Sequence, residues 1–324
     1  MELLAGDITI AVTVFNRRKY VVAAIRSALE QTIPVKVIVV EDCGPDKGLR
    51  DFILGEFGNR IQYFRNPRNR GLFDNWNACM EYCGTPWLSI LHDDDLLLPN
   101  CVESLIGQAK QTPGRGLYFG RANRLQPNGT CQPLGQIKWG GWRELGTGEG
   151  LASLTEECFL AFPGHIFSIA DVQRLGGFRK HSFFTGDWDM WFRLALKSGA
   201  VESAAIVAVV RCHDSWDRAS TRIERQGWKW VLDNVQRKRN IALLKSERGM
   251  VQRFQRLRPQ DKSPIPLRLM IGFARKFSRR ILVYNWWLII HSRPPHWSYA
   301  GLQWILRLLG PKGLLFVSSF FGRK

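Results

Sequence analysis

Three consecutive aspartates, Asp93, Asp94 and Asp95, stand between two apolar runs in the stretch WLSILHDDDLLLP, residues 87–99. Adjacent carboxylates repel one another and are costly to bury, so their charge must be neutralised. A divalent cation does this, because hard oxygen ligands suit Mg²⁺ or Mn²⁺. Mg²⁺ characteristically completes its coordination shell with substrate phosphates. The aspartates therefore predict a metal site for a phosphorylated substrate, where the metal would neutralise a diphosphate leaving group.

The apolar run before the aspartates is one of four predicted strands that alternate with helices. The expected strands are ITIAVTV (8–14), VKVIVV (35–40), IQYF (61–64) and WLSIL (87–91). Helical patterns cover residues 17–32, 47–57, 72–83 and 185–199. Strands that alternate with helices favour a parallel sheet with right-handed crossovers. The sequence therefore predicts an α/β fold with a mostly parallel sheet flanked by helices.

Polar residues cluster where three of these strands end. Asn16 and Arg17 follow the first strand, Glu41 and Asp42 follow the second, and the aspartates follow the fourth. Ligands of such sheets bind outside the carboxyl ends of the strands. Any single cluster is equally typical of helix caps and turns. Three clusters at one edge, one of them a triple carboxylate, indicate a binding site.

Seven motifs in this order resemble those of the inverting family 2 glycosyltransferases with the GT-A fold, over about residues 8–220. The stretch VTVFNR (12–17) is similar to the opening IPTYNR, and LHDDD (91–95) stands where LDSDD is usual. The other five similar stretches are SALEQ (27–31), EDCG (41–44), RNPRNRG (65–71), LGGF with GDWD (175–189) and RCH (211–213).

The resemblance implies a sugar transfer from a nucleotide-diphosphate sugar to a hydroxyl acceptor, with Mn²⁺ or Mg²⁺ as cofactor. It implies that Phe15 packs on the base, Asp42 meets the ring edge of the base and Asp93 meets the ribose. The remaining residues implied in donor binding are Thr13, Asn16, Arg17, Glu41 and Asn69. The implied metal ligands are Asp94, Asp95 and His213, and Asp187 is the implied general base.

The sequence departs from the family pattern at four positions. Thr13 replaces a proline, Glu41 replaces the first Asp of its pair, and Gly186 replaces the Glu before the base. His92 replaces the first Asp of the metal motif, which leaves the register of the three aspartates open by one residue. On its residue type alone, Asp187 is equally a helix cap.

Two other classes of protein fit parts of this pattern. A non-catalytic GT-A-like scaffold or carbohydrate-binding module would explain the replaced His92 and Gly186. A nucleotidyltransferase would share the sheet and the metal, but it should show a Gly-rich loop after the first strand. The stretch TVFNRR (13–18) contains no glycine.

The positive charge lies mainly in the C-terminal part. The chain has 46 Lys and Arg against 28 Asp and Glu, a net charge of +18. Residues 251–324 hold 14 of these cations and one acidic residue, which leaves +5 for the first 250 residues. Cations and apolar residues fall on opposite sides of a predicted helix around residues 268–284, as in helices that lie at a membrane interface. A helix packed on the catalytic domain is the alternative. No nucleic-acid-binding module is recognisable.

We therefore expect a GT-A catalytic domain over residues 1–222 and a basic helical extension over residues 223–324. Residues 1–100 would form the donor half and residues 101–222 the acceptor half. The N-terminus lacks the pattern of a signal peptide, and the seven cysteines lack the spacing of a disulfide framework. The expected location is cytoplasmic, peripheral on the inner face of the cell membrane. A saccharide or lipid-linked acceptor of polysaccharide or glycolipid synthesis fits that location.

Overall fold

The computed structural model of this 324-residue chain describes residues 3–134, 140–180, 185–212 and 229–246. The chain divides into two compact units. The first unit contains residues 1–179 and 186–222, and the second contains residues 180–185 and 223–324. In the second unit the described helix is α9 (Lys229–Ser246). All other described helices and strands belong to the first unit.

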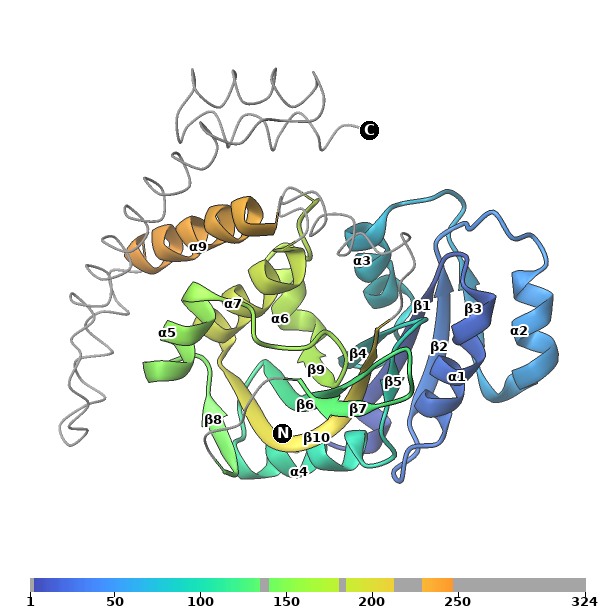
Figure 1. The fold of residues 1–324 in the computed structure, drawn as a ribbon, viewed down its shortest axis with the longest axis horizontal. Coiled ribbons are helices and arrows are strands. Elements are labelled where there is room, and N and C mark those ends of the chain that lie inside the picture. Colours follow the sequence, from blue (N-terminus) through green and yellow to red (C-terminus); the bar gives the residue numbers. More distant parts are fainter. Residues whose placement is uncertain (1–2, 135–139, 181–184, 213–228, 247–324) are drawn as a thin grey trace, which may run out of the picture. The chain divides into compact units, whose positions relative to one another are not determined.

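One sheet organises the first unit, with the strand order β3-β2-β1-β4-β9-β6-β10-β5 (Figure 1). Its first four strands run parallel to one another, in agreement with the prediction from the sequence. Every residue of β1 is buried, because the strand lies between two neighbours and is covered on both faces. The bounds of these strands are β1 (Ile8–Val14), β2 (Lys36–Glu41), β3 (Gln62–Arg65) and β4 (Trp87–His92).

The other half of the sheet is mixed. Strand β9 (His165–Ser168) runs antiparallel to both β4 and β6 (Leu117–Leu125), and β6 runs parallel to β10 (Ala200–Arg211). The register between β10 and β6 shifts between Glu202 and Ala208, where β10 curves in Figure 1. Three short strands pair at the margins: β5 (Leu96–Leu97), β7 (Cys131–Pro133) and β8 (Trp142–Glu144).

Four of the helices form where the sequence predicts them. Helices α1 (Arg18–Leu29), α2 (Leu49–Phe57), α3 (Leu72–Tyr82) and α7 (Gly186–Ser198) match the four helical patterns. The other helical segments are α4 (Cys101–Gln111), α5 (Gly148–Glu156), α6 (Ile169–Arg174) and the 3-10 turns at Ala5–Asp7 and Gly58–Arg60. Within the described residues, no helix combines the length and the apolar character needed to cross a bilayer.

The sheet is covered on both faces. On one face, aliphatic side chains of β1 and β2 pack with α1, α2 and α4 into one core. A second cluster is aromatic and includes Phe119, Phe167, Phe178 and Trp191, with the last on α7. Because both faces of the sheet are covered, a ligand-binding site is expected at the ends of the strands, where the polar groups lie.

Candidate active site

The carboxyl ends of β1, β2 and β4 meet at one edge of the sheet. In the strand register Val14 pairs with Glu41, and Thr13 pairs with His92. The Asp42 amide donates to the carbonyl of Val14 at 2.9 Å, and the Asn66 amide donates to that of Glu41 at 2.8 Å. The structure therefore brings together the loops that follow four strands, although they are distant in sequence.

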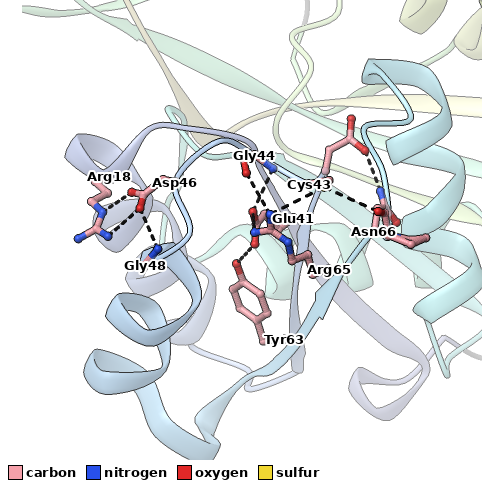
Figure 2. Close-up of polar contacts among 11 residues, drawn as sticks. Arg18, Glu41, Cys43, Gly44, Asp46, Gly48, Tyr63, Arg65 and Asn66 are labelled. Atoms are coloured by element: carbon pink, nitrogen blue, oxygen red, sulfur yellow. Dashed lines mark hydrogen bonds and ion pairs between the residues drawn. The ribbon is translucent and has the colours of Figure 1, made fainter.

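Glu41 anchors the loop after β2 from inside the protein. Its side chain is fully buried and accepts hydrogen bonds from the Tyr63 hydroxyl at 2.5 Å, the Gly44 amide at 3.0 Å and the Arg65 guanidinium (Figure 2). Burial, followed by the bond to Glu41, raises the pKa of Tyr63 well above its usual range. Because its carboxylate forms hydrogen bonds with these three groups, Glu41 fixes the conformation of the loop from the protein interior.

Gly44 allows this loop to approach the end of β1. A Cβ atom at position 44 would lie 1.7 Å from the carbonyl oxygen of Phe15, so a side chain there cannot be accommodated. The Phe15 side chain is 39% exposed, and Asn16 is also exposed. Thr13 is buried instead, and its hydroxyl lies 3.4 Å from the carbonyl oxygen of Leu91. Of these three residues, only Phe15 and Asn16 are presented to solvent.

Asp42 holds the loop that follows β3. Its carboxylate accepts hydrogen bonds from the Asn66 side-chain amide at 2.9 Å and from the backbone amides of Arg70 at 2.8 Å and Gly71 at 2.9 Å. Asn69 supports the same turn, because its side-chain oxygen accepts a bond from the Gly71 amide at 2.8 Å. The two predicted donor-site residues Asp42 and Asn69 thus belong to one hydrogen-bonded network that joins two loops.

The three aspartates are buried and paired with protein groups. One Arg17 nitrogen donates to Asp93 at 2.9 Å and to Asp94 at 3.2 Å, while the Arg211 backbone amide donates to Asp95 at 3.0 Å. Burial raises the pKa of Asp93 to about 6, against the opposing effect of the Arg17 charge. Arginine therefore supplies part of the neutralisation that the sequence attributes to a metal.

The donor set around these aspartates also suits a cation. His92, Asp94 and Asp95 each offer one ligand atom, and these atoms lie within 4.8 Å of one another. An imidazole with two carboxylates fits a first-row divalent ion such as Mn²⁺, so the residues present fit the implied cofactor. The predicted ligand His213 lies outside the described residues. The ligands predicted from the sequence did not include His92, although His92 occupies the first position of the metal motif.

Aromatic rings fix the orientation of His92. Its ring stacks on Phe162 with centroids 4.1 Å apart, and the Trp76 ring lies 5.6 Å away. Phe162 is held by His165, whose Nδ1 donates to the Phe162 carbonyl at 2.5 Å while Nε2 accepts from the Ile90 amide at 3.3 Å. This tautomer is assigned from the two contacts. Burial lowers the pKa of His165 to about 3, so the ring is neutral. Nothing in the local sequence signals that Phe162 or Trp76 belongs to this stack.

Asp187 and Asp189 differ in their surroundings on the first turn of α7. Asp187 is partly exposed, and its side chain accepts a bond from the Trp188 amide at 2.7 Å. Asp189 is buried and pairs with Arg193 at 2.8 Å. A carboxylate that serves as a general base must reach the acceptor, so exposure favours Asp187 over Asp189.

Arg193 and Phe73 position the N-terminal turn of α7. The Arg193 guanidinium donates to the carbonyl oxygens of Leu175 at 2.9 Å and Gly177 at 3.0 Å. At Gly186 a Cβ atom would lie 2.1 Å from the Phe73 ring. The ring therefore takes the space in which the family pattern has a glutamate side chain.

Comparisons with known proteins agree with this architecture. The chain is 26% identical to an uncharacterized glycosyltransferase of Rickettsia typhi over 217 residues, which cover 64% of each chain. It is 31% identical to the succinoglycan biosynthesis protein ExoO of Rhizobium meliloti over 104 residues, which cover 32% of this chain and 30% of ExoO. The chain thus spans less than two thirds of the length of these curated relatives.

Solved structures show the same fold at low sequence identity. The crystal structure of S. aureus TarS in complex with UDP-GlcNAc superposes with a TM-score of 0.55 at 15% identity, covering 72% of this chain and 66% of that chain. The sheet and its flanking helices are therefore of the GT-A type. The sequence model of Glycosyl transferase family 2 matches residues 9–169. Through this domain the chain belongs to glycosyl transferase family 2.

Proposed function

We propose that this protein is a metal-dependent, inverting glycosyltransferase that moves a sugar from a nucleotide-diphosphate donor to a hydroxyl acceptor. The observation that supports this most directly is the group formed by His92, Asp94 and Asp95 at the sheet edge where the Phe15 and Asp42 loops meet. The family, the glycosyltransferase names of its relatives and the TarS complexes with UDP-GlcNAc and UDP support the same reaction class.

In this proposal the donor lies across the three loops. The exposed ring of Phe15 packs on the base, Asp42 meets the base edge and Asp93 meets the ribose. Asn16, Arg17 and the Asn69 turn line the same site, while Thr13 and Glu41 support its shape from beneath. A Mn²⁺ or Mg²⁺ ion, held by His92, Asp94 and Asp95 with His213, would neutralise the charge that develops on the departing diphosphate.

Asp187 is the general base of the proposed reaction. Its carboxylate accepts the proton of the acceptor hydroxyl while the hydroxyl oxygen attacks the anomeric carbon. The bond from that carbon to the diphosphate oxygen breaks in the same step, and the nucleoside diphosphate leaves with the electron pair. Attack on the face opposite the leaving group inverts the configuration. Protein groups that exclude water strengthen these electrostatic effects.

The proposed cellular location rests on the basic extension. We propose that residues 223–324 place the catalytic domain of residues 1–222 on the inner face of the cell membrane, where a lipid-linked or saccharide acceptor is met. The segment 247–324, which carries most of the charge, lies outside the described residues. Its alternation of cations and apolar residues supports an interface with anionic lipid. The resemblance to ExoO supports a role in surface polysaccharide synthesis.

A donor panel tests the reaction. Nucleotide sugars are first screened with Mn²⁺ by thermal shift, since a ligand at 100 times its Kd stabilises the folded state by about 2.7 kcal/mol. The best donor is then assayed for turnover, with and without a chelator. Release of a nucleoside diphosphate in the presence of metal is the expected result. Release of pyrophosphate would indicate a nucleotidyltransferase instead, and donor binding without turnover would indicate a non-catalytic module.

A further inference from the structure

A single arginine nitrogen bridges two of the three aspartates. The same Arg17 nitrogen lies 2.9 Å from Asp93 and 3.2 Å from Asp94, and both carboxylates are almost fully buried. One cation that contacts two adjacent carboxylates has the role of a bridging metal ion. Asp94 is also one of the residues whose ligand atoms cluster for metal binding. Arg17 and a metal ion therefore compete for Asp94.

The charge of the site explains what this competition achieves. Two guanidinium groups lie beside the three aspartates: that of Arg17 contacts the Asp93 and Asp94 carboxylates, and the Nε of Arg211 donates to the Asp94 backbone carbonyl at 3.1 Å. With each carboxylate counted as −1 and each guanidinium as +1, these five side chains carry one net negative charge. A divalent ion makes the same site positive by one charge, at short distance and in a buried setting where repulsion is strong. A bound diphosphate supplies the negative charge that offsets this excess.

We propose that Arg17 is an exchangeable counter-cation that holds the metal site closed until the diphosphate arrives. It occupies Asp94 in the metal-free protein, yields Asp94 to the metal, and turns its guanidinium to the diphosphate when the nucleotide binds. This inference rests on the proposed function, because it takes a nucleoside diphosphate as the ligand.

The contacts of Arg17 permit such an exchange. Its side chain is 25% exposed, whereas those of Asp93 and Asp94 are 5% and 4% exposed, so the arginine is the member of the group that can move. The shorter contact is to Asp93, so Arg17 can release Asp94 and keep its other partner. The neighbouring Arg18 cannot substitute for Arg17, because its guanidinium forms two hydrogen bonds with Asp46 (Figure 2).

Metal and nucleotide should then bind cooperatively. Without nucleotide, the metal must displace Arg17 from Asp94, and the guanidinium, still beside Asp93, then faces the added divalent charge. With nucleotide, the displaced guanidinium finds a diphosphate, and a planar guanidinium suits phosphate oxygens. Each ligand therefore raises the affinity for the other by the same factor, as linkage requires.

Titration calorimetry of the full chain with Mn²⁺ alone, and with Mn²⁺ at saturating UDP, tests the inference. We compare the wild type with Arg17→Met, and use Arg18→Met as the control that removes the same charge one residue away. Arg17→Met should bind Mn²⁺ alone more tightly, within the roughly 5- to 150-fold range of typical coupling. At saturating UDP this advantage should disappear. Arg18→Met should match the wild type in both titrations.

A substitute variant and a turnover assay make the outcome decisive. Arg17→Gln, which retains a donor but no charge, replaces Arg17→Met if the latter does not fold. Equal Mn²⁺ affinity of the wild type and the Arg17 variants without nucleotide would overturn the inference. If the wild type nevertheless turns over the donor, the proposed function stands. Conversely, a metal affinity that rises in Arg17→Met without donor turnover by the wild type would overturn the function and support the exchange.

Discussion

The side-chain amide of Asn77 on α3 forms a pair of hydrogen bonds with the backbone of Phe178, 101 positions later in the chain. Its nitrogen donates to the Phe178 carbonyl at 3.0 Å, and its oxygen accepts from the Phe178 amide at 2.9 Å. Arg193 holds the same loop through the carbonyl oxygens of Leu175 and Gly177. The Leu175–Phe178 loop is thus held from two sides, and through Arg193 it is connected to the helix that carries Asp187.

We expect Asn77→Ala to lower the free energy of unfolding by about 1–3 kcal/mol, because two backbone groups lose their partner. Urea denaturation of the purified protein measures this. The control is Asn59→Ala, since Asn59 is exposed on the 3-10 turn Gly58–Arg60 and its replacement should cost less than about 0.5 kcal/mol. Equal effects of the two substitutions would show that the Asn77 bonds contribute nothing to stability.

Asp187→Asn should lower transfer to the acceptor by about 10²- to 10⁴-fold, because the amide keeps the shape but cannot accept a proton. Donor affinity and melting temperature should stay unchanged. Asp189→Asn is the matched comparison, two positions along α7. It should lower stability by as much as roughly 3–5 kcal/mol, since it leaves the buried Arg193 charge without its partner. Near-normal turnover in Asp187→Asn would reduce Asp187 to a helix cap.

Gly186→Ala should destabilise the protein by about 1–3 kcal/mol, since the added methyl group overlaps the Phe73 ring. In a Phe73→Ala background the same change should cost much less, because the ring is gone. Chemical denaturation of the four proteins of this double-mutant cycle measures the coupling. A cost of Gly186→Ala that is equal in both backgrounds would show that the ring does not limit this position.

The stability of the protein should fall with pH below about 6.5 in part because of His165. Its folded pKa, about 3, lies below its unfolded value near 6.5, so the unfolded state takes up a proton first as the pH falls. The loss approaches roughly 1.4 kcal/mol per pH unit between these two values. Denaturation of the wild type and His165→Gln at pH 7 and pH 5 measures it.

The variant His165→Gln should show a shallower dependence on pH than the wild type. Asp93 has the opposite effect, because its raised pKa adds stability as the pH falls through about 6. That contribution is common to both proteins and cancels in the comparison. Parallel pH profiles for the two proteins would contradict a neutral, buried His165.

The basic extension should bind anionic lipid. We expect reversal of Arg275, Lys276, Arg279 and Arg280 to Glu to release the protein from anionic vesicles, since each cation near such a surface contributes about 1 kcal/mol. Co-sedimentation with vesicles that contain or lack anionic lipid measures this. Donor hydrolysis should persist in the variant, which serves as the control for folding. Equal pelleting of both proteins would reject the electrostatic contribution.

Local sequence patterns were enough to predict the parallel half of the sheet and the loops around it. The β-branched run of residues 8–14 identifies a strand buried on both faces, and all seven residues of β1 are buried. The polar residues after β1, β2 and β4 identify the edge of the site, because parallel strands bring their carboxyl ends together. Burial patterns of this kind repeat along the chain itself, so they can be read without knowledge of distant contacts.

Only the tertiary structure decided which partner each polar group has. The sequence indicated that the aspartates need a cation, but Arg17 meets Asp93 from 76 positions away. His92 became a candidate ligand because its ligand atom and those of Asp94 and Asp95 lie within 4.8 Å of one another, and its ring stacks on Phe162 and Trp76 from other segments. Phe73 fills the space beside Gly186, 113 residues later in the sequence. Such contacts depend on strand register and on how loops pack against one another. The spacing of neighbouring residues does not encode either of these. For this reason the sequence predicted the arrangement of strands and helices, but it did not predict which charged side chains pair.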